Sequence, residues 1–339
     1  MTVTTAAIYG CAGLTLSRDE QAFFRDANPW GFILFRRNIE TPDQVRALVA
    51  ELRTCVGRAD APVLIDQEGG RVQRLGPPHW PVYPAGARYA AVARDPQHQQ
   101  SLVRLGARLM AADLYDLGIN VDCVPVLDVP QPGAHDVIGD RAYGLTPEVV
   151  AAMGRAACEG LMAGGVLPVI KHIPGHGRAG ADSHLELPRV DTPLETLEAV
   201  DFLPFRACSD MPLAMTAHVV YDAIDPKAPA TTSKKAIRLI RESLGFEGLL
   251  MSDDLSMKAL SGDFGKRVRK SLKAGCDVVL HCNGDPAEMT AIAVEVPRLK
   301  GQAARRAAAA LARLPRTPEP FDREAAKAAF AAAFAGASD

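Results

Sequence analysis

The chain has 339 residues, of which 48% are hydrophobic and 23% are charged, so it can bury the core of a globular protein. A formal net charge of −2 and a pI near 6.5 exclude a global electrostatic attraction for nucleic acid or for an anionic membrane. No stretch approaches the roughly 20 apolar residues of a membrane span. The seven cysteines are scattered and form no CxxC pair, which is typical of a reducing compartment. We therefore expect a cytoplasmic protein that binds neither nucleic acid nor membranes.

Short β-rich apolar runs alternate with amphipathic segments along the chain. The predicted strands are Ala6–Cys11, Trp30–Phe35, Pro62–Ile65, Asn120–Pro125, Leu167–Lys171, Leu213–Ala217, Gly248–Ser252 and Asp277–His281. The predicted helices between them include Thr41–Val56, Gln99–Leu117, Thr146–Gly164 and Lys234–Leu244. This alternation predicts an α/β fold, a closed (β/α)8 TIM barrel with some irregular strands. An open, doubly wound sheet would begin with a glycine-rich phosphate turn, but Gly13–Leu16 follows the first strand here.

The last part of the chain becomes rich in alanine, as in Ala303–Leu314 and Ala325–Ala337. Alanine has the highest helix propensity, so these segments predict closing helices. No Pro/Gly/Ser-rich linker or internal repeat divides the sequence. We therefore predict one domain over residues 1–339, with the barrel at about residues 5–300 and C-terminal helices at about 300–339. A monomer is the default expectation.

Polar residues occur at or near the ends of nearly every predicted strand. They are Asp66-Gln67-Glu68, Asp122 and Asp128, Lys171-His172, His218, Asp253-Asp254, and His281 with Asn283. In a TIM barrel the catalytic groups lie at the C-terminal ends of the strands. Charged groups that converge there repel or desolvate one another unless a ligand or mutual pairing compensates. The pattern predicts an active site at this mouth of the barrel.

The densest cluster is Lys171–Gly177 (KHIPGHG), followed by Asp182–His184 (DSH). The Pro-Gly step predicts a loop over the mouth. Asp182 and His184 are two residues apart, so in an extended segment their side chains would share one face. A carboxylate beside an imidazole fixes its tautomer and raises its basicity, which suits general acid–base catalysis. The alternative is a metal site, although the spacing fits no dedicated zinc motif; its ligands would be His172, His176 and His184.

Two acids, Asp253 and Asp254, follow an apolar strand. An aspartate just past a barrel strand can point its carboxylate into the cavity. Alternatively, Ser252 or one of the acids caps a helix that begins near Leu255. Both roles can coexist, and the residues alone do not decide which aspartate takes which.

The segment Asp66–Arg74 combines acids, a Gly-Gly turn and two arginines, and Gly139–Gly144 offers a further arginine. An acid here could accept hydrogen bonds from two sugar hydroxyls, and the forked arginine donors could hold hydroxyl or carboxylate oxygens. The alternative for each residue is an internal salt-bridge network at the barrel rim.

Taken together, DQEGGRVQR (66–74), GDRAYG (139–144), KHIPGHG with DSH (171–184) and SDDLSM (252–257) resemble glycoside hydrolase family 3. Within that family they are similar to the bacterial NagZ-type β-N-acetylhexosaminidases of peptidoglycan recycling. The resemblance runs in order from about Gly31 to Asn283, which is nearly the whole predicted barrel. It departs at Ile173 and Tyr143, where phenylalanine is usual or common, and Arg178 lies between the two halves of the loop motif.

The resemblance implies specific roles. Asp253 matches the family nucleophile, and His184 matches the general acid/base, with Asp182 as its dyad partner. The positions that grip N-acetylglucosamine in the innermost subsite are matched by Asp66, Arg74, Arg141, Lys171 and His172. The implied enzyme is a retaining exo-β-N-acetylglucosaminidase that needs no metal or organic cofactor. Its implied substrates are muropeptide-derived N-acetylglucosaminides, such as N-acetylglucosaminyl-anhydro-N-acetylmuramic acid with or without its peptide.

Several alternatives stay open at this point. The barrel could host a β-glucosidase or β-xylosidase, a phosphorolytic enzyme, a metal-dependent hydrolase or a non-catalytic sugar-binding protein. Many β-glucosidases of the family take their acid/base from a second, sandwich-type domain, which we do not expect here. The glycines and proline of Ile173–His184 predict a mobile loop that closes over bound sugar.

Overall fold

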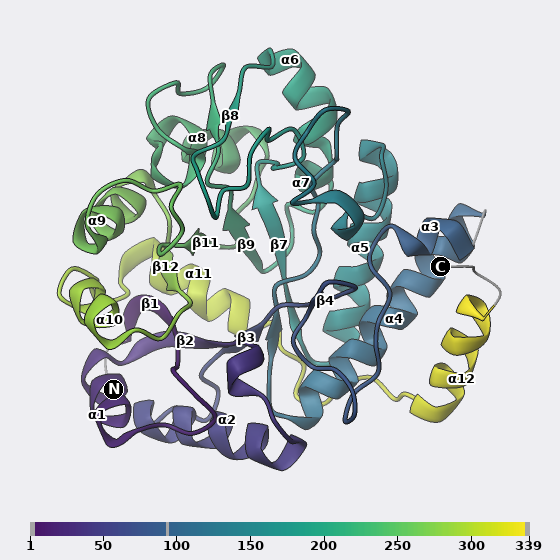
Figure 1. Ribbon diagram of the computed structural model, residues 1–339, viewed down its shortest axis with the longest axis horizontal. Helices are drawn as coiled ribbons and strands as arrows, with labels where there is room; N and C mark the ends of the chain where they lie inside the picture. Colours follow the sequence, from purple (N-terminus) through teal and green to yellow (C-terminus); the bar gives the residue numbers. More distant parts are fainter. Residues whose placement is uncertain (1–3, 93–94, 336–339) are drawn as a thin grey trace.

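A computed structural model describes residues 4–92 and 95–335. Eight strands form a closed barrel (Figure 1). Their order around the barrel is β1-β12-β11-β9-β7-β6-β3-β2. Every neighbouring pair is parallel, including the closing pair of β12 with β1. The strands are β1 (Thr5–Gly10), β2 (Pro29–Leu34), β3 (Val63–Ile65), β6 (Val121–Asp122), β7 (Leu167–Ile173), β9 (Leu213–Thr216), β11 (Leu249–Asp254) and β12 (Val278–His281). The eight predicted strands and the TIM barrel are therefore confirmed.

The strand ends differ from the prediction in ways that matter for the mouth of the barrel. β6 is shorter than predicted and stops at Asp122. β7 and β11 are longer and reach Ile173 and Asp254, because Ile173 still pairs with β9 and Asp254 still pairs with β12. The residues Lys171-His172 and Asp253-Asp254 therefore lie within the strands, where the ladder fixes their direction.

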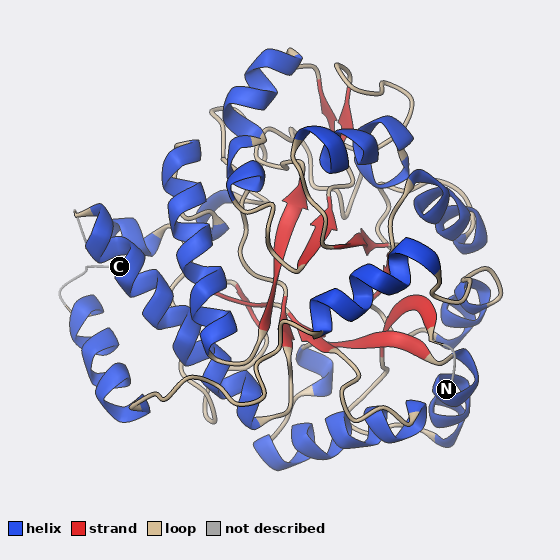
Figure 2. Cartoon of the chain, turned by 180° about the vertical axis from the view of Figure 1, so that it is seen from behind, coloured by secondary structure: helices blue, strands red, loops and turns tan. Residues whose placement is uncertain are grey.

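Helices surround the barrel (Figure 2). Those that follow successive barrel strands include α1 (Arg18–Ala27), α2 (Pro42–Val56), α4 (Pro96–Asp116), α5 (Pro147–Ala163), α7 (Leu203–Ala207), α8 (Lys234–Arg238), α9 (Phe264–Ala274) and α10 (Pro286–Ala293). In α2, α4 and α5 a proline occupies the first turn, where its missing N–H is not needed. The predicted helices are found within a few residues, except that 234–244 divides into α8 and a π-helical segment, Leu239–Ser243. Two short helices, α3 (Arg88–Val92) and α6 (Leu194–Thr196), complete the connections.

The prediction of a helix beginning near Leu255 is wrong. The chain turns after β11, and α9 begins only at Phe264, with Asp263 as its N-cap. The turn forms because Asp254 accepts a hydrogen bond from the Ser256 backbone N–H at 3.0 Å. Ser252 caps no helix either, since its hydroxyl accepts a hydrogen bond from the Leu280 N–H at 3.0 Å.

Two small sheets flank the barrel. β4 (Gln67–Gly69) and β5 (Val72–Gln73) form an antiparallel hairpin, and β8 (Arg189–Val190) pairs with β10 (Val220–Tyr221). The Gly-Gly turn of the hairpin is required by packing: a Cβ on Gly69, whose φ is +93°, would lie 2.3 Å from the Pro84 carbonyl oxygen. The hairpin thus holds the segment after β3 close to the barrel mouth.

Two further helices end the described chain, α11 (Gly301–Leu311) and α12 (Arg323–Phe334). They confirm the predicted alanine-rich helices within a few residues, and Ala337 lies outside the described residues. Ala307 and Ala310 of α11 belong to the same hydrophobic cluster as Ala6, at the start of β1. Among residues 4–92 and 95–335, no helix is long and apolar enough to cross a membrane.

Candidate active site

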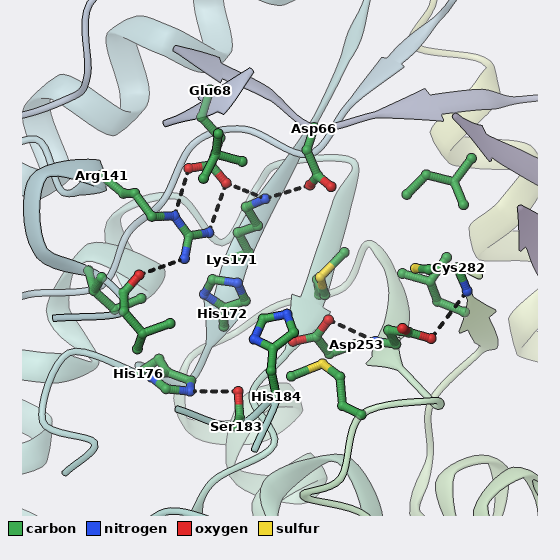
Figure 3. A pocket seen from close by; sticks show the side chains of 18 of the residues that line it. Asp66, Glu68, Arg141, Lys171, His172, His176, Ser183, His184, Asp253 and Cys282 are labelled. Atoms are coloured by element: carbon green, nitrogen blue, oxygen red, sulfur yellow. Dashed lines mark hydrogen bonds and ion pairs between the residues drawn. The ribbon is translucent and has the colours of Figure 1, made fainter. Parts of the chain in front are cut away.

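A cavity of about 240 Å³ lies at the C-terminal ends of the barrel strands. Seven of the eight predicted site residues line it: Asp66, Arg74, Arg141, Lys171, His172, His184 and Asp253. Figure 3 shows all of these except Arg74 with labels. The eighth, Asp182, contacts His184. Other polar residues at strand ends do not line this cavity, namely Asp122, Asp128, His218, His281 and Asn283. Four further polar lining residues were given no catalytic or sugar-binding role by the resemblance: Glu68, His176, Ser183 and Asp254.

Asp66 follows β3 and is held by two cations. Its carboxylate accepts hydrogen bonds from the Arg74 guanidinium at 2.9 Å and from Lys171 Nζ at 2.8 Å. Burial alone would raise the pKa of Asp66, but the charges of Lys171 and Arg74 outweigh it and hold the pKa well below its ordinary value. Asp66 is therefore ionised, and it fixes both cations against the cavity wall.

Glu68, on β4, joins the remaining cations into one network. Its carboxylate accepts two hydrogen bonds from Arg141, at 2.9 and 2.8 Å, and forms an ion pair with Lys171 Nζ at 2.6 Å. Burial acts to raise the pKa of Glu68, yet Lys171 and Arg141 lower it to about 2. Burial alone would lower the pKa of Lys171, but the two carboxylates raise it above its ordinary value. We call Asp66, Glu68, Arg141 and Lys171 the ion-pair network.

The resemblance gave no role to Glu68, although its spacing from Asp66 indicates one. Asp66 and Glu68 are two residues apart, and in extended backbone such residues share one face. The structure confirms the alternative of internal salt bridges in this segment, whereas sugar binding by these residues stays a prediction. The ion-pair network is an internal salt-bridge system, and its members line the cavity.

His172, on β7, is oriented by a buried carboxylate. Its Nδ1 lies 2.7 Å from Asp128 Oδ2, and its backbone N–H donates to Asp128 Oδ1 at 3.2 Å. Burial would raise the pKa of Asp128, but the neighbouring imidazole of His172 lowers it below its ordinary value. An ionised Asp128 favours the proton on Nδ1 of His172, so Nε2 is the ring nitrogen left for the cavity.

His184 and Asp182 form a pair in a turn, not in the extended segment that the spacing suggested. Asp182 Oδ1 accepts from the His184 backbone N–H at 2.9 Å and contacts His184 Nδ1 at 2.8 Å. The turn arises because the Asp182 carbonyl accepts from the Leu185 N–H at 2.9 Å. The His184 side chain is 66% exposed. Burial raises the pKa of Asp182, but hydrogen bonds from His184 lower it below its ordinary value.

Asp253 and Asp254 have different surroundings although both line the cavity. Asp254 is bound to the turn that follows β11 and also accepts from the Cys282 N–H at 3.2 Å. Asp253 accepts a hydrogen bond from the Asp254 N–H at 2.7 Å. Burial would raise the pKa of Asp253, but the imidazoles of His218 and His172 lower it below its ordinary value. Figure 3 shows the His184 ring directed toward the side of the cavity that holds Asp253.

The arrangement does not resemble a metal centre. Asp128 contacts Nδ1 of His172, and Ser183 contacts Nε2 of His176. In the part of the chain that the structure describes, no three His, Cys, Asp or Glu side chains are grouped so that they could hold a metal ion. The cavity instead offers the ionised Asp253, the exposed imidazole of His184 on a loop, and cations that Asp66 and Glu68 hold in place.

Residues 8–316 match the family described as the glycosyl hydrolase family 3 N terminal domain. The chain therefore belongs to glycoside hydrolase family 3. It is 40% identical over 293 residues to a Beta-hexosaminidase from Alkalilimnicola ehrlichii, covering 85% of this chain and 83% of that protein. It is 41% identical over 280 residues to a Beta-hexosaminidase from Methylococcus capsulatus, covering 81% and 82% of the two chains.

The fold is also similar to solved structures of the family. NagZ from Neisseria gonorrhoeae, in complex with N-trifluoroacetyl-D-glucosamine, superposes with a TM-score of 0.83 at 32% identity. The similarity covers 98% of this chain and 97% of that one. The resemblance found in the sequence motifs is thus confirmed, and the enzyme is a glycoside hydrolase related to the β-hexosaminidases.

Proposed function

We propose that this chain is a retaining exo-β-N-acetylglucosaminidase that releases terminal β-linked N-acetylglucosamine. The observation that carries the proposal is the gathering of three parts in one cavity: the ionised Asp253, the loop imidazole of His184 and the ion-pair network. The relatives named Beta-hexosaminidase and the NagZ complex with an N-acylated glucosamine support the acetamido sugar as the substrate.

In the first step, Asp253 attacks the anomeric carbon and His184 gives its proton to the leaving oxygen, so the sugar becomes an ester of Asp253. Two features support these roles. The lowered pKa of Asp253 keeps it anionic, as a nucleophile must be. Asp182 contacts Nδ1 of His184 at 2.8 Å, and its charge stabilises the protonated ring while Nε2 faces the substrate.

In the second step, neutral His184 accepts a proton from water as the water attacks the same carbon and releases Asp253. Two displacements at one carbon retain the anomeric configuration. Most retaining enzymes use two carboxyl groups about 5–5.5 Å apart, and that distance does not apply where an imidazole replaces one of them.

The sugar itself is gripped from the floor and wall of the cavity. We assign this role to Asp66, Arg74, Arg141, Lys171 and His172. Because the cations among them are already paired with Asp66 and Glu68, few side-chain rotations remain to be lost when sugar binds. Such a site is preorganised for the hydroxyl and amide groups of the sugar.

We extend the proposal to the physiological setting. The substrate we propose is N-acetylglucosaminyl-anhydro-N-acetylmuramic acid, with or without its peptide, in peptidoglycan recycling. The enzyme would act in the cytoplasm as a monomer of one domain, without a metal or organic cofactor. The loop Ile173–His184 would close over the bound sugar, which protection of this loop from protease by bound sugar would test.

The direct test is nitrophenol release from the aryl β-glycoside of N-acetylglucosamine, with the aryl β-glucoside and β-xyloside in parallel. We expect strong preference for the acetamido sugar. Preference for the glucoside or xyloside would overturn the substrate assignment, and turnover that depends on phosphate would indicate phosphorolysis. Loss of activity with a chelator would indicate a metal-dependent enzyme, and inactivity of the folded protein on all three would favour a sugar-binding barrel.

A further inference from the structure

The turn that carries His184 contains a buried residue that ties it to neighbouring segments of the barrel. Ser183 is 3% exposed, whereas the side chains on either side of it, Asp182 and His184, are 22% and 66% exposed. A serine buried within an exposed turn needs polar partners, because an unpaired buried hydroxyl is costly. Its partners show what holds the loop in place.

Ser183 makes contacts in two directions. Its hydroxyl lies 3.1 Å from Nε2 of His176, and its carbonyl oxygen accepts a hydrogen bond from the Ala259 N–H at 3.3 Å. The first contact joins the turn to the segment after β7, and the second joins it to the turn after β11. Ser183 therefore connects the loop to the two strands that carry His172 and Asp253.

His176 is itself rigidly placed. It is 3% exposed, and its backbone N–H donates to Asp128 Oδ1 at 2.6 Å. Asp128 is fully buried and also orients the His172 ring. One carboxylate thus anchors both the sugar-facing imidazole of His172 and the imidazole that contacts the loop.

The surroundings of His176 indicate which atom donates in its contact with Ser183. Its Nδ1 is buried and has no hydrogen-bond partner among the described residues. A buried N–H without an acceptor is rarer than a bare acceptor, so we assign the ring proton to Nε2, which donates to Ser183 Oγ. Burial also lowers the pKa of His176 to about 4, so the ring is neutral at physiological pH and the contact is a neutral hydrogen bond.

We propose that His176 and Ser183 are positioning residues for proton transfer: their hydrogen bond sets the place of His184 over Asp253. The inference rests on the proposed function. The Asp182–His184 pair lies within one turn, so it orients the ring relative to the loop but not relative to the barrel. The bond from Ser183 to His176 supplies that second reference, and a displacement of about 1 Å in a proton donor can lower a rate about 100-fold.

A positioning role in proton transfer has a signature that depends on the leaving group. A glycoside of a weakly acidic alcohol needs a proton on its oxygen when the bond breaks, whereas dinitrophenolate leaves without one. The value of kcat/KM reports the first displacement. Misplacing His184 should therefore slow the first kind of substrate selectively, whereas weaker sugar binding or partial unfolding would slow both kinds alike.

The experiment compares the wild-type enzyme with Ser183→Ala on the phenyl and 2,4-dinitrophenyl β-glycosides of N-acetylglucosamine. We expect kcat/KM for the phenyl glycoside to fall about 10- to 100-fold and that for the dinitrophenyl glycoside to change less than about threefold. Ser233→Ala is the matched control, because it removes a hydroxyl that is 1% exposed and caps α8 away from the cavity. It should leave the ratio of the two values unchanged.

Two variants of His176 keep the proposal testable if one of them folds poorly. His176→Gln retains an N–H donor, so its kcat/KM for the phenyl glycoside should fall less. His176→Phe has no donor and should show the same selective fall as Ser183→Ala. The double variant that combines His176→Phe with Ser183→Ala should be no worse than the worse single variant, because both substitutions remove the same bond. A thermal melt of each variant checks the fold.

Each remaining outcome has a definite meaning. An equal fall on both substrates, or no fall with Ser183→Ala, would overturn the positioning role while leaving the proposed function intact. Failure of the wild-type enzyme to hydrolyse either N-acetylglucosaminide would overturn the proposed function, and the positioning role with it.

Discussion

The two parts of the site are built in opposite ways. The ion-pair network lies on β7, on the segment that follows β3 and, at Arg141, on the connection between β6 and α5. It is nearly removed from solvent, with the Lys171 and Glu68 side chains 3% and 6% exposed. The Asp182–His184 pair lies on a loop, and the His184 side chain is 66% exposed. Under the proposed function, the buried part binds the sugar and the exposed part moves protons.

The difference follows from what each task requires. Holding fixed cations against a neutral sugar benefits from a rigid, water-poor wall, where electrostatic interactions are strong and little reorganisation is needed. A proton donor beside the leaving group must let the substrate enter and the product leave, which favours a loop. Substitutions in the two parts should therefore change different quantities, the dependence of kcat/KM on the leaving group in one and KM and stability in the other.

The largest effect should come from the exposed part. His184→Ala should lower kcat/KM for the phenyl glycoside by about 10²- to 10⁴-fold, because under the proposed function it removes the general acid. The dinitrophenyl glycoside should lose far less, and the melting temperature should hardly change because the side chain is exposed. Parallel kinetics and melts of both proteins check this. Equal losses on the two substrates would place His184 in sugar binding instead.

The buried part should show the opposite signature. Glu68→Gln keeps the shape but removes the charge that pairs with Arg141 and Lys171, so KM should rise about 10- to 100-fold for both leaving groups. Stability should also fall by about 3–5 kcal/mol, the usual effect of breaking a buried pair. Kinetics on both glycosides and urea unfolding measure the two effects.

The matched control is Asp277→Asn, which breaks the buried Arg241–Asp277 pair outside the cavity. It should lower stability in a similar way but leave KM unchanged. Glu68→Gln could instead leave KM constant and lower kcat more for the phenyl than for the dinitrophenyl glycoside. That result would contradict the assignment of sugar binding to the ion-pair network and of proton transfer to the Asp182–His184 pair.

A smaller effect should appear in the dependence of stability on pH. The pKa of Glu68 is lowered from 4.5 to about 2, so its ionised form stabilises the fold above about pH 4.5, and this contribution is lost as the pH falls toward 2. The wild type should thus lose up to about 3 kcal/mol of this contribution over that range. The stability difference from Glu68→Gln, measured by urea unfolding at about pH 5 and pH 3, should shrink at the lower pH. A constant difference would mean that Glu68 is not held by its cations.

Much of the fold was predictable because barrel strands are short, apolar and regularly spaced. The predicted strands all occur. The polar residues near their C-terminal ends predicted the end of the barrel at which the cavity lies. The prediction of a helix near Leu255 is wrong because the Asp254 side chain accepts a hydrogen bond from the Ser256 N–H, and this local turn competes with helix initiation. Periodicity alone does not record such local competition.

The site was predictable only where the motif itself carried the chemistry. Asp253 and His184 were assigned their roles by resemblance, and both line the cavity. Glu68 and the Ser183 backbone, by contrast, have partners far along the chain, Arg141 and Ala259. Glu68 contacts Arg141, 73 residues away, and Ser183 depends on burial within a loop that looks exposed in sequence. These contacts exist only after the barrel closes, so no local pattern displays them.

Under the proposed function the reaction proceeds by two displacements, in which Asp253 is the nucleophile and His184 gives and then takes the proton. His184→Ala mixed with the 2,4-dinitrophenyl glycoside of N-acetylglucosamine should form the ester but hydrolyse it slowly, since no base activates water. Mass spectrometry of the quenched protein should show one added N-acetylglucosaminyl group on the peptide that contains Asp253, and no adduct when Asp253→Asn is also present. A catalytically active protein without this adduct, or with the sugar on another residue, would contradict the account.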